Sequence, residues 1–263
     1  METEHTQPRR KTFLRGHSTP VWVLGCSLLL SVVTIGASGR APGNSSSSDS
    51  SASPRLGKTD HELTEYRALR RMHAKSDKFS QEGWLDAWTE FDGTSFRYRV
   101  MSERGSDYVR NKVLKAVLKR EQELIAEGLA GRAALTEENY EFADEETDGS
   151  GLRYVAIKPK RKEVTLVDGR MVLSADGSDL LRVEGRLAKN PSFWTSLVNI
   201  IRHFAKIDGV RVPVATESIA KVKFAGQSRL DVYYEYESIN GRPVSTAARR
   251  ILAAASPGAP FPE

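Results

Sequence analysis

The sequence has 263 residues, and its 39 Lys and Arg against 34 Asp and Glu give a formal charge of +5. Beyond residue 40 the chain carries 34 basic and 32 acidic side chains, so nucleic-acid binding has little electrostatic support. The single cysteine, Cys26, lies in an apolar run, which leaves the rest of the chain without a disulfide or a thiolate metal site.

The N-terminal segment has the pattern of an export signal. Residues 1–20 form a basic leader, expected in the cytoplasm, and residues 21–39 are uncharged, as in a signal peptide or a signal-anchor transmembrane helix. Ala37-Ser38-Gly39 is an acceptable cleavage site, so cleavage stays open. Residues 40–59 are Ser-rich and predict a disordered linker. A tether directly after an apolar segment favours an anchor, and thus a periplasmic domain held at the inner membrane by one N-terminal helix.

Two segments have the apolar spacing of helices. The first is Asp60 to Lys75, and the second is Asp107 to Glu127, after which Gly128 supplies a stop. The first rests on Leu63, Tyr66, Leu69 and Met72; the second rests on Val109, Val113, Leu114, Val117, Leu118, Leu124 and Ile125. We therefore expect one or two helices against the sheet described next.

Most of the remaining chain alternates in the manner of strands. Tight turns are expected at six dipeptides that tolerate positive φ: Asp92-Gly93, Asp148-Gly149, Asp168-Gly169, Asp176-Gly177, Asp208-Gly209 and Asn240-Gly241. Short strands are expected on either side of Asp168-Gly169. In the stretch from Leu181 to Leu187, the side chains of Leu181, Val183 and Leu187 should face the core or a ligand, and those of Arg182, Glu184 and Arg186 should face water.

Three further segments complete this interpretation. Residues Leu197 to Ile207 suit a helix nearly as well as a strand, and the nearby turn favours a strand. The strand that begins at Val210 changes phase before Ala220, which indicates a bulge and a bent sheet. Residues 249–263 are expected to be a disordered, Pro-rich tail.

The order of LLRVEGRLAKNPSFW, VNIIRHFAKIDG, RVPVATES and YYEYESING resembles the LolA-like outer-membrane lipoprotein-sorting proteins and their uncharacterised relatives, from about Arg71 to Val244. The resemblance implies an α+β fold, mainly antiparallel, in which a curved, incompletely closed β-barrel (a half-barrel) packs over one or two helices, with residues 60–248 as the domain. It also implies an apolar concavity that holds acyl chains. The leader, the tether and the insertion around Arg132 to Gly151 distinguish this chain from a soluble carrier, because an anchored domain cannot shuttle freely.

Aromatic side chains supply the candidate ligand-binding residues. Trp84 and Trp88 share one face of a strand, and Phe96 and Tyr98 share a face of the next. Such faces can line an acyl pocket, or they can fill the core against the helices. Phe193-Trp194 could form a lip over the pocket or a core plug. The candidates for the hydrophobic cavity are Trp84, Trp88, Phe96, Tyr98, Leu181, Val183, Phe193, Trp194 and Tyr234.

Catalytic and metal-binding patterns are absent from the sequence. His61, His73 and His203 lack the spacing of a zinc helix, and no Gly-rich phosphate loop or Gly-flanked serine occurs. We therefore expect no metal, no cofactor and no enzyme activity, with an unrecognised hydrolase as the residual possibility. The expected function is a non-enzymatic cell-envelope protein that binds a lipid acyl chain or a lipidated protein. The alternative is a membrane-tethered interaction or sensor domain with a closed core.

Overall fold

The computed structural model describes residues 60–257, except 194 and 224–225. The strands are β1 (Tyr66–Ser76), β2 (Gln81–Phe91), β3 (Phe96–Gly105), β4 (Tyr140–Thr147), β5 (Arg153–Pro159), β6 (Val167–Leu173), β7 (Leu180–Leu187), β8 (Thr195–Ile207), β9 (Val210–Val222), β10 (Gly226–Ile239) and β11 (Arg242–Pro243). The helices are α1 (Asp107–Val109), the π-helical η2 (Arg110–Leu114), α2 (Lys115–Ala126), the 3₁₀ turn η3 (Ala130–Ala133) and α3 (Thr246–Ala255).

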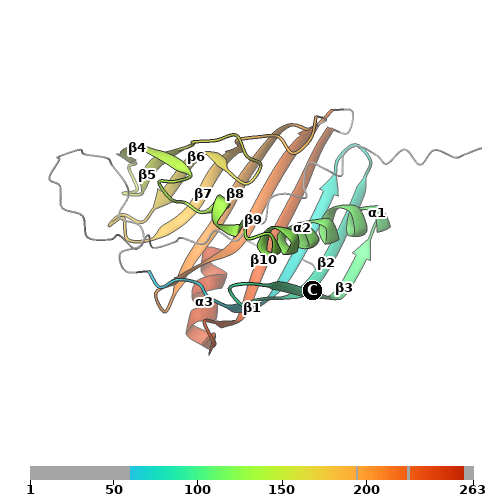
Figure 1. The fold of residues 1–263 in the computed structure, drawn as a ribbon, viewed down its shortest axis with the longest axis horizontal. Coiled ribbons are helices and arrows are strands. Elements are labelled where there is room, and N and C mark those ends of the chain that lie inside the picture. The colour runs from blue at the N-terminus through green and yellow to red at the C-terminus, as the bar shows by residue number, and fades with distance from the viewer. Residues whose placement is uncertain (1–59, 194, 224–225, 258–263) are drawn as a thin grey trace, which may run out of the picture.

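The strands form one antiparallel sheet that stays open. Its order is β3-β2-β1-β10-β9-β8-β7-β6-β5-β4, with β11 paired to β10, so β3 and β4 are the two edges. Figure 1 shows the sheet curved, with α2 lying across one face. The expected class, a mainly antiparallel half-barrel packed with a helix, is confirmed.

The register defines two faces of the sheet. We call the face toward α2 the inner face; Arg70 lies on it, because its side chain contacts Glu121 of α2. From strand to strand the pairing carries this face through Ala68, Met72, Leu85, Ala87, Phe96, Tyr98, Val183, Val198, Ile200, Thr216, Val232 and Tyr234. The helix α3 packs against β8, β9 and β10. Tyr233, whose side chain belongs to the outer face, lines a groove together with residues of α3. The sheet thus has a helix on each side.

The helix expected from Asp107 to Glu127 is confirmed as the continuous run α1–η2–α2. Ser106 caps its start by accepting a hydrogen bond from the backbone N–H of Val109, and Gly128 follows its end with φ of 69°. Its buried side includes Val113, Leu114, Val117, Leu118, Leu124 and Ile125. The π-helical turn of η2 interrupts the regular spacing near its start.

The helix expected from Asp60 to Lys75 is wrong, because Tyr66 to Ser76 form the strand β1. The three-residue spacing of its apolar side chains hid an alternation of Tyr66, Ala68, Arg70 and Met72 on the inner face. β1 pairs along its whole length with both β2 and β10, so tertiary pairing outweighs the local helical pattern.

The turn expected at Asp168-Gly169 is also wrong, since both residues lie within β6. Gly169 pairs with Gly185 of β7. A Cβ at Gly169 would clash with the carbonyl oxygen of Glu184 and lie 2.6 Å from the Cα of Gly185. The glycine serves the close approach of two strands, not a reversal of the chain.

The other strands largely follow their sequence patterns. Residues Leu197 to Ile207 lie in β8, and the turns at Asp208-Gly209 and Asn240-Gly241 join neighbouring strands. A bulge does occur in β9, but earlier than expected: Val214 is the extra residue between the pairs His203–Ala215 and Phe204–Pro213, and the pairing from Thr216 to Ala220 is regular. Arg182, Glu184 and Arg186 lie on the outer face, as expected.

The C-terminal segment differs from the expected disordered tail from residue 249, because α3 extends to Ala255. Ser245 caps the helix by accepting a hydrogen bond from the backbone N–H of Ala248 at 3.1 Å. Ala248 and Leu252 are buried. Within the described part of the chain, none of the helices has the length and apolarity needed to cross a membrane. The leader, residues 21–39 and the linker lie outside the described residues.

Candidate functional site

The most distinctive feature of the inner face is a buried ion pair that joins the sheet to α2. The guanidinium of Arg70 donates to Glu121 through two hydrogen bonds, Nη1 to Oε2 at 2.5 Å and Nη2 to Oε1 at 2.9 Å. The Arg70 side chain is 1% exposed and that of Glu121 is 2% exposed. Two full charges are thus held away from water by each other, in a geometry that fixes α2 over β1.

Aromatic rings surround this pair. The hydroxyl of Tyr66 accepts a hydrogen bond from Arg70 Nη2 at 2.5 Å. The guanidinium carbon of Arg70 lies 4.9 Å from the ring centroid of Phe96 and 4.8 Å from that of Tyr234. These ring faces place negative electrostatic potential beside the cation, which offsets part of its lost hydration.

The protonation states follow from this environment. Burial opposes the charge on Arg70, but the Glu121 carboxylate, together with the smaller effects of Tyr66 and Tyr234, outweighs it, so the pKa of Arg70 lies well above its usual value. Burial also raises the pKa of Tyr66 and of Tyr234, so both stay neutral hydrogen-bonding groups at neutral pH.

Four of the sequence-predicted candidates reach the inner face, in two separate places. Phe96 and Tyr234 flank Arg70, and Tyr98 packs against the core next to Phe96, with ring centroids 6.4 Å apart. Val183 lies on β7, beyond β9 and β8 from Tyr234. There it lines a small cavity, which we call the inner cavity.

The inner cavity is small. Its volume is about 20 Å³, and it is lined by Ala133, Leu135, Tyr140, Thr165, Val167, Val183, Ile200, Arg202 and Phe204. This is room for about one water molecule, whereas ligand pockets hold on the order of 300 to 1,000 Å³. Tyr140 is fixed there by accepting a hydrogen bond from the backbone N–H of Val167 at 3.1 Å. An acyl chain would therefore need more space than this cavity has in this conformation.

The two tryptophans lie on the outer face, contrary to the expectation that they join Phe96 in a cavity. Trp84 pairs across the strands with His73, and its ring stacks on that histidine at 5.0 Å between centroids. The guanidinium carbon of Arg104 lies 4.6 Å from the Trp84 ring, and that of Arg67 lies 4.7 Å from the Trp88 ring. The smaller Leu85 and Ala87 alternate with the tryptophans and take the inner face.

Two further candidates, Leu181 and Phe193, are exposed to solvent, and a third is outside the described residues. Leu181 is 37% exposed, because the pairing of β6 with β7 shifts there and buries Leu180 instead. Phe193 is 78% exposed on the loop before β8, with Lys223 Nζ 4.4 Å from its ring centroid. It does not cover the inner cavity. Trp194 lies outside the described residues.

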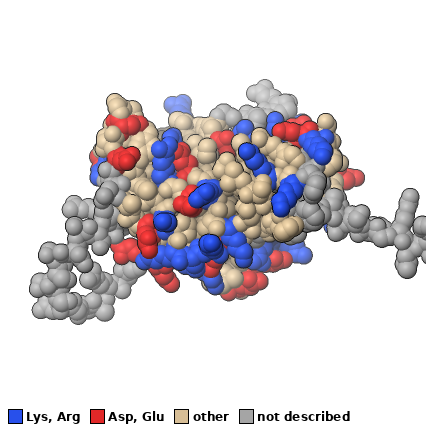
Figure 2. Space-filling view, turned by 90° about the horizontal axis from the view of Figure 1, so that it is seen from above, with Lys and Arg blue, Asp and Glu red and all other residues tan. Residues whose placement is uncertain are grey.

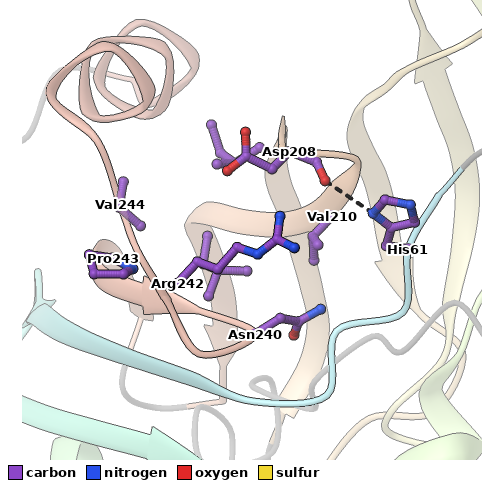
Figure 3. A pocket seen from close by; sticks show the side chains of 9 residues that line it. His61, Asp208, Val210, Asn240, Arg242, Pro243 and Val244 are labelled. Atoms are coloured by element: carbon purple, nitrogen blue, oxygen red, sulfur yellow. Dashed lines mark hydrogen bonds between the residues drawn. The ribbon is translucent and has the colours of Figure 1, made fainter.

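A pocket of about 200 Å³ with mixed polar and apolar lining lies where the start of the domain meets two turns. Figure 3 shows His61 on one side and Arg242, Pro243 and Val244 on the other. The His61 ring nitrogen Nδ1 lies 3.1 Å from the carbonyl oxygen of Asp208, and it must be the donor of this bond because a carbonyl only accepts. The Asn240 side chain bonds the backbone of residues 62, 64 and 65, so this pocket mainly fastens the entering chain.

A larger groove, of about 400 Å³, runs between α3 and β10. Its lining comprises Tyr233, Tyr234, Glu235, Tyr236, Arg249, Leu252, Ala253, Ser256 and Pro257. The sequence analysis missed this groove because residues from 249 onward were expected to be a tail. The Ala-rich run with Leu252 after Ser245 was the signal for a helix.

Another depression, of about 350 Å³ at the β3 edge, brings Trp88 and Tyr98 beside Arg67, Arg97 and Arg99.

The described residues hold no group of three or more His, Cys, Asp and Glu side chains placed to share a metal ion. Arg70 and Glu121, at the centre of the inner face, were also missed, since the predicted helix over β1 concealed their pairing. The inner face therefore presents apolar side chains around the shielded Arg70–Glu121 ion pair, with Arg202 beside the inner cavity.

Comparisons with known proteins give a distant structural likeness. The chain matches no family model and no curated protein sequence. A solved structure of a DUF1329 family protein from Desulfovibrio piger ATCC 29098 is similar over 71% of this chain and 91% of that chain, with 10% sequence identity and a TM-score of 0.33.

Proposed function

We propose that this chain is a non-enzymatic protein of the cell envelope that binds an acyl chain, or the acyl part of a lipidated protein, between the inner face of its sheet and α2. The observation that carries the proposal is the arrangement of that helix. α2 presents a buried apolar side to the concave sheet, and a single buried ion pair, Arg70–Glu121, joins it to β1. The resemblance to LolA-like proteins in the sequence agrees with this use of the fold.

Binding by this route requires α2 to move. The inner cavity of about 20 Å³ cannot admit an acyl chain, so the ligand must replace the apolar side of α2 or wedge beneath it. An acyl chain offers the sheet the same kind of surface as Val117, Leu118 and Leu124. The π-helical turn of η2, just before α2, is a natural point for such a movement.

The location in the cell belongs to the same proposal. Residues 21–39 would anchor the chain in the inner membrane and place the domain in the periplasm, where residues 40–59 let it reach its ligand. A new N-terminus near Arg40 in the exported protein would contradict the anchor.

The experiment is native mass spectrometry of residues 60–263, which lack the proposed anchor and are purified without detergent, together with uptake of a fluorescent fatty acid by the same domain. Lipid that is bound to the protein should be detected with it in the mass spectrum. Glu121→Ala, which removes the partner of Arg70, should increase the uptake. Arg71→Ala is the matched control, because its ion pair with Glu235 lies exposed on the outer face. A chain that carries no lipid, and takes up no probe even as Glu121→Ala, would contradict the proposal.

The small inner cavity favours a second candidate, a tethered interaction domain whose core stays closed. In that case partners bind the outer surface, and Trp88 becomes the aromatic residue to change. Trp88→Glu would then abolish partner binding in a protein that remains folded, as an unchanged melting temperature would show. Absence of lipid in every variant, together with this pattern, would favour the second function over the first.

A further inference from the structure

Three connections meet at the end of the sheet opposite the entry of the chain. β1 ends at Ser76, which pairs with Ser228 near the start of β10, and the backbone N–H of Asp77 donates to the carbonyl of Gln227 at 3.0 Å. Thr195, at the start of β8, pairs with Val222 at the end of β9. The β1–β2 turn, the loop before β8 and the end of β9 therefore lie side by side.

This end combines exposed aromatic side chains with lysines. Among the described residues, five large hydrophobic side chains are exposed, and both aromatic ones lie here: Phe79 at 46% and Phe193 at 78%. Five exposed lysines accompany them, namely Lys75, Lys78, Lys189, Lys221 and Lys223. We call these seven residues the Lys–Phe end.

Few acidic side chains balance the lysines. Asp77 lies on the β1–β2 connection and Glu82 near the start of β2, where Glu82 Oε1 is directed to His73 Nε2 at 2.6 Å. The loop from Ala188 to Phe193 carries none. Figure 2, seen from above the view of Figure 1, shows Lys and Arg side chains among uncharged surface, with separate groups of Asp and Glu side chains between them.

We propose that the Lys–Phe end docks the domain on a membrane surface rich in anionic phospholipid. Phe79 and Phe193 enter the boundary between headgroups and acyl chains, and the lysine ammonium groups contact lipid phosphates. The long aliphatic stems of the lysines allow both contacts at once. The surface goes beyond the proposed ligand site, since it lies on the turns and not on the inner face.

The chemistry of this end favours a lipid surface over a protein partner. Lysine is depleted at protein interfaces, where aromatic and arginine side chains prevail. Paired aromatic and lysine side chains on projecting turns are suited to a headgroup layer, which needs no shaped complement. Lys223 lies over the Phe193 ring, so the cation and the apolar group already stand together.

The test uses the full chain reconstituted in vesicles of phosphatidylcholine, with and without phosphatidylglycerol. Amide hydrogen exchange is measured at residues 77–81 and 188–193. Because any N-terminal anchor is present in both vesicles, a difference between them reports on docking. We expect slower exchange in these segments only with phosphatidylglycerol, and its loss at high salt.

Variants then assign the effect to named side chains. Lys223→Gln should reduce the docked population about fivefold, and Phe193→Ser about tenfold. Met101→Ser and Lys119→Gln, which change exposed residues elsewhere, should have no effect. An unchanged melting temperature confirms that each variant is folded.

Three results would overturn the proposal. The first is an exchange rate that neither kind of vesicle changes. The second is equal slowing of exchange with and without phosphatidylglycerol. The third is a docked population that falls as much in the control variants as in Lys223→Gln and Phe193→Ser. Slowing that requires an added membrane protein would assign this end to a protein partner instead.

Discussion

Arg70 of β1 and Glu121 of α2 meet through two hydrogen bonds inside the domain, where neither side chain is more than 2% exposed. The pair lies among the rings of Tyr66, Phe96 and Tyr234. A buried pair of this kind contributes little net stability by itself, but the loss of one partner leaves a charge without compensation. The relationship therefore makes the position of α2 sensitive to a single side chain.

Removing one partner of the Arg70–Glu121 ion pair should lower the stability of the domain. Glu121→Ala is expected to lower the free energy of unfolding by about 3–5 kcal/mol, because Arg70 keeps its buried charge. Denaturant unfolding measures the change. Arg71→Ala, which breaks an exposed pair, should cost no more than about 1 kcal/mol. The double variant Arg70→Met with Glu121→Leu should recover much of the loss; equal effects of the two single variants would contradict the account.

The contact between β6 and β7 gives a second prediction. Gly169→Ala should lower stability by about 1–3 kcal/mol, because its Cβ would meet the backbone of Glu184 and Gly185. Gly149→Ala is the matched control: nothing lies within 4 Å of a Cβ there, and the change should stay within about 0.5 kcal/mol. Thermal or denaturant unfolding compares the two, and a harmless Gly169→Ala would show that the strands can separate.

The helix α3 should contribute to the stability of the domain. Leu252 is 5% exposed and Ile251 is 52% exposed, so adjacent residues provide a test of burial alone. We expect Leu252→Ala to cost about 2–5 kcal/mol and Ile251→Ala no more than about 0.5 kcal/mol. If both variants unfold at the same denaturant concentration as the parent, α3 is not packed on the sheet.

Asp148 should titrate at unusually low pH. Hydrogen bonds from the hydroxyls of Ser150 and Tyr154 lower its pKa from 3.8 to about 2. Since the folded state has the lower pKa, the stabilising effect is present above about pH 4 and is lost as the pH falls through about 2. NMR titration of the carboxyl group measures the midpoint. Tyr154→Phe should raise it and Tyr98→Phe should not; a midpoint near 3.8 in the parent protein would refute the bonding pattern.

Several elements were predictable because their signals are local. The stop at Gly128, the turn at Asp208-Gly209 and the alternation from Arg182 to Arg186 each depend on residues close in sequence. Of the candidate ligand residues, Phe96, Tyr98, Val183 and Tyr234 lie on the inner face, and their role in binding a ligand stays a prediction. Period-two alternation assigns side chains to opposite faces, but it does not say which face covers the helix.

The sequence by itself determined a mainly antiparallel fold with one long amphipathic helix, since apolar periodicity, turn dipeptides and caps act over a few residues. Only the tertiary structure decided that Tyr66 to Ser76 form a central strand, that Trp84 and Trp88 face outward, and that Gly169 serves close strand contact. It also decided that Arg70 meets Glu121. Each of these depends on pairing between segments far apart in the chain, where the free energy of burial and strand pairing outweighs local preference.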